Sequence, residues 1–188
     1  YVSAWLKCHH PAAFYVGLLN SQPMGFYSPS QLIQDARRHH IMVLPVDVNH
    51  SSWDHQILPS TNQQEPPIRL GLRLIKGLSE AAGQRIHTAQ RQRPFVNVAD
   101  LRQRACLDRG DMEALAAADA LSGISGNRYQ SHWQTMALEA HRPLLSYDSA
   151  AQRSQDDAAV TAAPTLPEDV IADYQSTGLT LRSHPLSL

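Results

Sequence analysis

The chain has 188 residues, of which 43% are apolar and 6% aromatic, and its 16 basic and 17 acidic side chains give a net charge of −1. This length suits one or two domains with a real apolar core. A membrane-spanning helix is excluded, because no run approaches about 18 uncharged apolar residues, and no secretory signal is visible. Two cysteines, Cys8 and Cys106, cannot build a disulfide scaffold, so we expect a reducing, cytoplasmic setting.

The beginning of the chain has the character of interior sequence. It starts with Tyr1, and the first methionine is Met24. Most of the first nineteen positions already hold apolar residues. We therefore expect a piece of a longer protein, with part of the functional machinery outside it.

The first forty residues favour three helices. Residues 1–19 are rich in apolar side chains, and Pro11 divides them into two short helices. A loop follows at 22–27. Ser28, followed by proline, is typical of a helix start, and this third helix should end near His40.

Three later stretches favour β-strands. Residues 41–48 are rich in β-branched side chains, and Pro45 places this strand at a sheet edge. A weak strand signal covers 53–58. Apolar residues alternate strictly over 68–74, which is the clearest strand pattern in the chain. We expect the last two strands to pair as an antiparallel hairpin across the polar loop 59–67.

Helices dominate the rest of the chain, so the predicted fold is mainly α with a small antiparallel β-hairpin. A polar, alanine-rich stretch at 143–164 with few large apolar residues predicts a flexible linker, and one more helix is expected at 167–175. The four helices before the linker are expected at 80–90, 98–105, 109–118 and 128–137, with capping residues Ser79, Asn97, Asp108 and Asn127.

The near-zero net charge hides a strong asymmetry. Residues 69–109 hold nine basic and three acidic side chains, whereas residues 148–173 hold six acids and one arginine. A basic middle with a charge of +6 favours a polyanionic partner. An ordinary solvated charged face is the alternative interpretation of the same pattern.

The segment 74–86 has the pattern of a helix-hairpin-helix. Its order is Gly77, an apolar residue, Ser79, three spacers, Gly83, two spacers and Ile86. Gly77 permits a tight turn with positive φ, and Leu78 plugs the hairpin into the core. The amides at the start of the next helix then point outward, where the positive end of that helix attracts a phosphate. We expect Gly83 to let two helices approach closely.

A second, weaker turn–helix unit covers 120–128. Two such units would hold backbone phosphates without reading base edges, so binding would ignore sequence. For each unit the alternative is an ordinary turn before a capped helix. The predicted DNA-binding residues are Arg73, Lys76, Gly77, Leu78, Ser79, Arg85, Gly123, Gly126 and Arg128.

Other chemistry is not favoured by the sequence. The run Cys8-His9-His10 lacks a second cluster with metal-ligand spacing. The two cysteines have no base partner or helix-start setting, and no Walker-type glycine loop is present. Asp47 and Asp54 lack a nearby partner carboxylate for metal-assisted phosphoryl transfer. The remaining candidates are expected to be surface or helix-end histidines: His39, His40, His50 and His55.

These residues resemble the fingers and helix-hairpin-helix region of bacterial C-family DNA polymerases, and specifically the error-prone branch related to the polymerase III alpha subunit. His40 departs from the family, which usually has glycine there. The resemblance covers nearly the whole chain, weakening only at about 142–166. It is carried by residues 1–14 (YVSAWLKCHHPAAF), 18–27 (LLNSQPMGFY), 35–38, 44–49, 71–78, 115–121, 173–174, 177–181 and His184-Pro185.

The resemblance implies damage-induced translesion synthesis and DNA repair by magnesium-dependent nucleotidyl transfer. The family's catalytic aspartates lie in a palm upstream of residue 1, so no catalytic residue and no metal ligand is assigned here. Primer-template duplex DNA, deoxynucleotides and mutagenesis accessory proteins are the implied partners. A sliding-clamp contact is not favoured, because 141–145 only distantly matches a clamp-binding peptide. Weak nucleotide-proximal candidates are Lys7, His9 and His10.

The resemblance also implies a domain order. The end of the fingers covers 1–66, the helix-hairpin-helix region 67–141 and the flexible linker 142–166, and 167–188 leads toward an OB-type domain. A free-standing, non-catalytic helix-hairpin-helix DNA-binding module is the main alternative. A metal-dependent hydrolase is a third, which the scattered histidines do not support.

Overall fold

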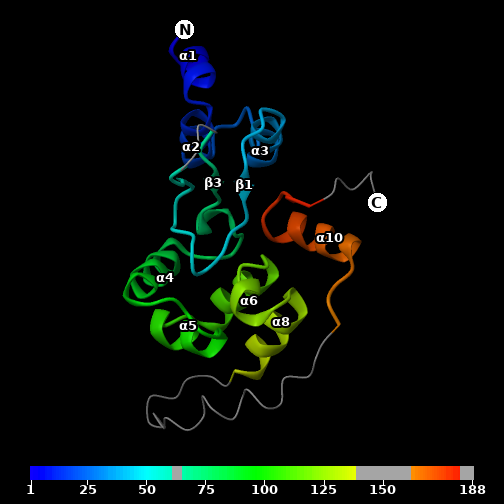
Figure 1. Ribbon diagram of the computed structural model, residues 1–188. Helices are drawn as coiled ribbons and strands as arrows, with labels where there is room; N and C mark the ends of the chain where they lie inside the picture. Colours follow the sequence, from blue (N-terminus) through cyan, green and yellow to red (C-terminus); the bar gives the residue numbers. More distant parts are fainter. Residues whose placement is uncertain (61–64, 139–161, 183–188) are drawn as a thin grey trace.

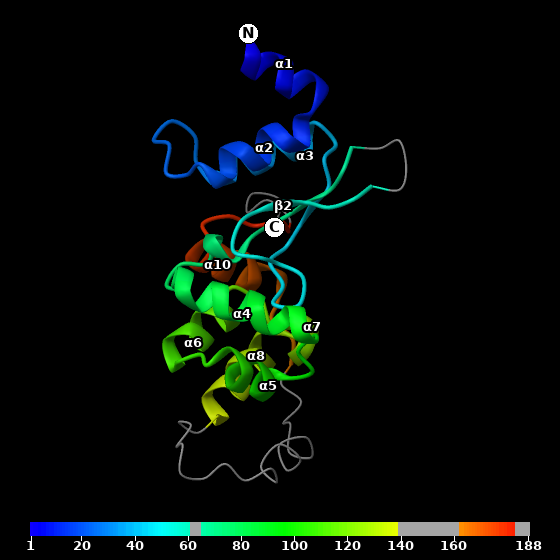
Figure 2. The ribbon, with the colours of Figure 1, turned by 90° about the vertical axis from the view of Figure 1, so that its left-hand side faces the viewer.

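The computed structural model describes residues 1–60, 65–138 and 162–182, and it is mainly helical with one small sheet, as the sequence predicts (Figure 1). The first three helices lie at one end of the molecule and the later helices at the other (Figure 2). Among the described residues, no helix is long and apolar enough to cross a membrane. The first three helices are α1 (Val2–His9), α2 (Pro11–Asn20) and α3 (Pro29–Arg38).

The local signals at these helices work as predicted. Pro11 begins α2 after a break at His10. Ser28 forms a full capping box, because its hydroxyl accepts a hydrogen bond from the Gln31 amide and its own amide donates to the Gln31 side chain. The helix α3 ends where His40 adopts a φ of +62°, a left-handed conformation that favours glycine.

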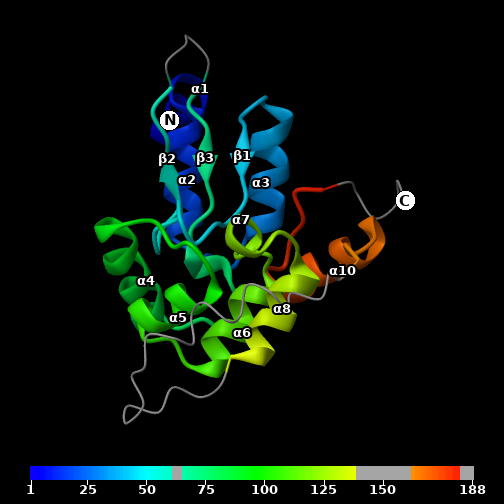
Figure 3. The same ribbon diagram turned by 60° about the horizontal axis from the view of Figure 1, so that its bottom comes forward.

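The sheet holds three two-residue strands, β1 (Val43–Leu44), β2 (Gln56–Ile57) and β3 (Ile68–Arg69). The antiparallel pairing of β2 with β3 confirms the predicted hairpin. The sequence did not predict that β1 pairs in parallel with β3, which gives the order β1-β3-β2 (Figure 3). The strand β1 is an edge strand, as Pro45 indicates.

The alternating segment 68–74 is a strand only at its start, and the prediction of a longer strand was wrong. Its second half forms the 3₁₀ helix η1 (Leu72–Leu74). The chain leaves the sheet at Gly71, where a built Cβ would lie 2.4 Å from the carbonyl oxygen of Trp53. Leu72 stays fully buried without a strand, because its amide bonds to the Ser52 carbonyl oxygen at 2.8 Å.

The later helices confirm the four predicted caps. The side chains of Ser79, Asn97, Asp108 and Asn127 each accept a hydrogen bond from the amide three residues ahead. The helices are α4 (Glu80–Gln92), α5 (Val98–Ala105), α6 (Arg109–Ala117), the short α7 (Ser122–Ser125), α8 (Arg128–Ala137) and α10 (Leu166–Ser176).

The main apolar core runs through both ends of the molecule. Leu19 and Ile33 from the first helices belong to the same buried cluster as Leu72, Ile86 and Leu115. A smaller second cluster surrounds the fully buried Tyr15. The core is therefore continuous across the predicted domain boundary at 66/67, which stays a prediction, and most of the predicted linker at 142–166 lies outside the described residues.

Two asparagine side chains join segments that are distant in sequence. The Asn20 amide bonds to the backbone N–H and carbonyl of His55, at 2.9 and 3.0 Å. The Asn49 amide does the same with Phe95, at 2.7 and 3.0 Å. Each side chain thus completes two backbone hydrogen bonds at once, which fixes the hairpin to α2 and the end of the α4 segment to the turn after β1.

Candidate nucleic-acid interface

The first predicted turn is built as the helix-hairpin-helix pattern requires. Gly77 has a φ of +87°, which a side chain would strain. Leu78 is only 7% exposed and packs in the core, whereas Gly77 and Ser79 on either side of it are exposed. The backbone of the turn is thus accessible to a nucleic-acid strand, while Leu78 anchors the turn in the core.

The start of α4 leaves several amides without an internal acceptor. Ser79 caps the Ala82 amide at 3.1 Å. Among the described residues, the amides of Gly77, Ser79, Glu80 and Ala81 have no acceptor. Such amides, at the positive end of a 13-residue helix, attract an anion. Glu80 is exposed at the first helical position and places an opposing carboxylate there.

The cations predicted to flank this turn are exposed, but each already binds a carbonyl oxygen of the protein. The Lys76 ammonium donates to the carbonyl oxygens of Tyr174 and Gln175, at 3.1 and 3.0 Å, and so caps the end of α10. The Arg85 guanidinium donates to the Ala105 carbonyl oxygen at 2.9 Å. Both side chains hold neighbouring helices at the carboxyl ends that attract cations.

Arg73 has a similar internal role. Its guanidinium donates to the carbonyl oxygens of Asn20 and Gln22, at 2.8 and 3.3 Å, and to the Asp54 carboxylate at 2.8 Å. It therefore ties the loop after α2 to the segment that leads into the first turn. The number of basic residues in the sequence could not show whether an arginine binds a phosphate or joins two segments of the protein, because the same side chain does both.

Gly83 has a different role from the predicted one. The ring of Trp53 lies over it, and a built Cβ would come within 2.3 Å of the ring atom Cε3. The expectation that Gly83 lets two helices approach was wrong, since the close neighbour is a side chain from the segment before β2. The indole fills the space that the missing side chain leaves.

The second turn differs in its surroundings. Gly126 has a φ of +98° and is exposed, as is Gly123. However, a built Cβ at Gly123 would lie 3.0 Å from a carboxylate oxygen of Asp47. An acid beside the turn opposes a phosphate there.

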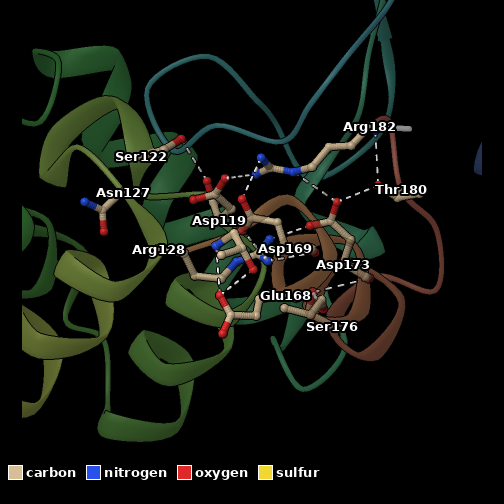
Figure 4. A network of polar contacts seen from close by, with 12 residues as sticks. Asp119, Ser122, Asn127, Arg128, Glu168, Asp169, Asp173, Ser176, Thr180 and Arg182 are labelled. Carbon is tan, nitrogen blue, oxygen red and sulfur yellow. Dashed lines mark hydrogen bonds and ion pairs between the residues drawn. The ribbon is translucent and has the colours of Figure 1, made fainter. Parts of the chain in front are cut away.

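Arg128 is not presented to a phosphate, which corrects its prediction as a DNA-binding residue. It is 3% exposed and pairs with Asp169, at 2.9 Å, and with Asp173 (Figure 4). Arg182 contacts the same two acids and Asp119, the last at 2.7 Å. Burial raises the pKa of Asp119, although the two guanidinium groups oppose that shift. The network docks α10 onto α8.

The three predicted nucleotide-proximal residues, Lys7, His9 and His10, lie in two different places. The Lys7 ammonium pairs with the Asp35 carboxylate at 2.7 Å, and the Tyr15 hydroxyl donates to the same carboxylate at 2.7 Å. Burial, followed by this hydrogen bond, raises the pKa of Tyr15 to about 12. His9 and His10 instead line a surface hollow of about 300 Å³ against the β-hairpin.

His55 is buried, which contradicts its prediction as a surface or helix-end residue. It is 4% exposed, and its Nδ1 accepts a hydrogen bond from the Gly71 amide at 3.1 Å. Burial, and secondarily the charge of Arg73, lowers the pKa of His55 to about 4. His55 thus supports, as a neutral ring, the backbone that leads into η1 and the first turn.

The comparisons with known proteins agree with this geometry. A family profile for the helix-hairpin-helix motif matches residues 40–131. Proteins named error-prone DNA polymerase are similar over this whole chain, with 50% identity in Methylococcus capsulatus and 52% in both Teredinibacter turnerae and Saccharophagus degradans. The chain spans 18–19% of the length of these relatives.

Proposed function

We propose that this chain is part of an error-prone DNA polymerase, in which it holds the backbone of duplex DNA without reading the sequence. Its similarity to proteins of that name along the whole chain confirms the resemblance seen in its residues. We propose further that the whole enzyme copies damaged templates in the bacterial cytoplasm, as a damage-induced mutagenic polymerase.

One observation carries the DNA-holding role. Gly77 and Ser79 of the first turn are exposed, and the amides at the start of α4 have no partner among the described residues; both lie within the matched helix-hairpin-helix segment. Backbone amides and a helix N-terminus bind phosphate oxygens but carry no information about bases. This geometry supports binding that is independent of sequence.

The catalytic step belongs to other parts of the proposed enzyme. Magnesium is held by several oxygen ligands, and the described residues bring together no group of three or more His, Cys, Asp or Glu that could hold a metal ion. We therefore assign no residue of this segment to magnesium, and we place the catalytic carboxylates, the deoxynucleotide and accessory partners with the parent protein. Primer extension by the purified chain would overturn this assignment.

The experiment is a fluorescence titration of the chain with blunt DNA duplexes of unrelated sequence at several salt concentrations. We expect equal affinity for all sequences and weaker binding at higher salt. Glu80→Gln removes the carboxylate beside the open amides, so it should raise the affinity about two- to fivefold. Glu65→Gln, which removes an exposed carboxylate next to the β-hairpin loop, should leave the affinity unchanged.

Two results would contradict the proposal. A preference for one duplex sequence would mean that bases are read. An identical response to Glu80→Gln and Glu65→Gln would remove the first turn from the interface. A free-standing binding module would bind DNA in the same way. The similarity of this chain to error-prone DNA polymerases along its whole length supports the polymerase interpretation over that alternative.

A further inference from the structure

A second surface with the chemistry for nucleic acid lies on the loop between α2 and α3. Met24, Phe26 and Tyr27 in this loop are 37%, 88% and 59% exposed. Figure 2 shows the loop standing out beyond the end of α2. Exposed apolar side chains grouped on one loop mark an interaction site more often than a scattered surface residue does.

The loop holds its aromatic residues in a defined conformation. The Gln22 side chain closes it, because its amide nitrogen donates to the Tyr27 carbonyl oxygen at 3.0 Å and its oxygen accepts from the Met24 amide at 3.2 Å. Gly25, between them, has a φ of +79°. A loop that is ordered by its own hydrogen bonds presents two rings at low entropic cost.

The base of this loop is joined to the lead-in of the first turn. Arg73 binds the carbonyl oxygen of Gln22 at 3.3 Å and lies four residues before Gly77. Four residues span at most about 14 Å between Cα atoms. Arg73 thus links the base of the aromatic loop to the segment that leads into the open amides at the start of α4.

The electrostatic setting also suits a nucleic acid. No charged residue occurs between Gly17 and Gln34, so the loop itself contributes no carboxylate that would repel phosphates. Aromatic rings stack on unpaired bases of any sequence, because every base has a π face. Duplex bases are already stacked on each other, so such rings can serve only a base that has left the duplex.

We propose that Phe26 and Tyr27 form a stacking platform for an unpaired base of the DNA strand whose duplex part is held at the Gly77 turn. This inference rests on the proposed function. It adds a second kind of contact, to single-stranded DNA at a junction, which the phosphate-binding turn cannot make.

The test compares the affinity of the whole chain for a blunt duplex with its affinity for the same duplex carrying a short single-stranded overhang. Wild type should bind the overhang substrate about tenfold more tightly, the size expected for stacking one base. The double variant Phe26→Leu, Tyr27→Leu should lose that preference and keep its affinity for the blunt duplex. Phe26→Tyr should retain the preference, because it keeps a ring.

Trp133→Leu is the matched control, since Trp133 is 54% exposed on α8, away from the loop; it should change neither affinity. Two results would overturn the stacking platform while leaving the proposed function intact. One is equal affinity of the wild type for the blunt and overhang duplexes. The other is an overhang preference that survives the double leucine variant, in which case the rings face another partner, such as a protein. Failure to bind either substrate would overturn both proposals.

Discussion

The two turn–helix units of this molecule have similar sequences and different surroundings. Both contain an exposed glycine with positive φ followed by a side-chain cap, Ser79 in the first and Asn127 in the second. The first opens onto amides that have no acceptor in the described part of the chain. The second lies beside Asp47 and leads directly into the buried Arg128 network, in which three aspartates outnumber two arginines.

This difference shows that a helix-hairpin-helix pattern specifies the bend and not its use. The first bend leaves the N-terminal end of α4 open, so it suits an anion. The second bend positions Arg128 to receive α10, so it serves packing.

The second unit should depend on its buried arginine for stability. Arg128→Ala leaves Asp169 and Asp173 with only the more exposed Arg182 as a partner, and we expect a loss of about 3–5 kcal/mol in the free energy of unfolding. Urea unfolding followed by circular dichroism measures it. Arg109→Ala removes an exposed pair with Glu113 and should cost under about 1 kcal/mol. Equal losses in the two variants would refute a buried anchoring role.

The first unit should be sensitive to acid through His55. The folded protein holds the pKa of His55 near 4, below the ordinary 6.5, so the unfolded chain binds the proton more readily. The stabilisation is complete above pH 6.5 and is lost as the pH falls toward 4, by up to about 3 kcal/mol. His55→Gln should remove this part of the pH dependence. Thermal unfolding between pH 7 and 4 measures it, and an unchanged pH profile in the variant would count against the buried neutral ring.

The positive-φ glycines of the two turns should separate stability from DNA binding. Gly77→Ala and Gly126→Ala each force a side chain into a left-handed conformation, at a cost of about 1 kcal/mol. Only Gly77→Ala should also lower duplex affinity, by about fivefold, because it disturbs an amide that we propose binds phosphate. Paired melting and binding curves test this. Equal effects on affinity would mean that both turns touch DNA.

Local signals in the sequence predicted most of the elements. Caps such as Ser28, Ser79 and Asp108, and the break at Pro11, act within a few residues of themselves, so they can be read without knowing the fold. The bend at Gly77 belongs to the same class. The family resemblance was also available from the residues, because whole-chain similarity needs no coordinates.

Only the tertiary structure decided what the charged and buried polar residues do. The predicted phosphate-binding cations Arg73, Lys76, Arg85 and Arg128 all have partners inside the protein, and His55 lies in the interior. The partners of these four cations are 19 to 99 residues away along the chain, from Asp54 for Arg73 to Gln175 for Lys76. A bend or a cap is a property of a few consecutive residues, whereas the partner of a charge is whichever group the folded chain brings to it.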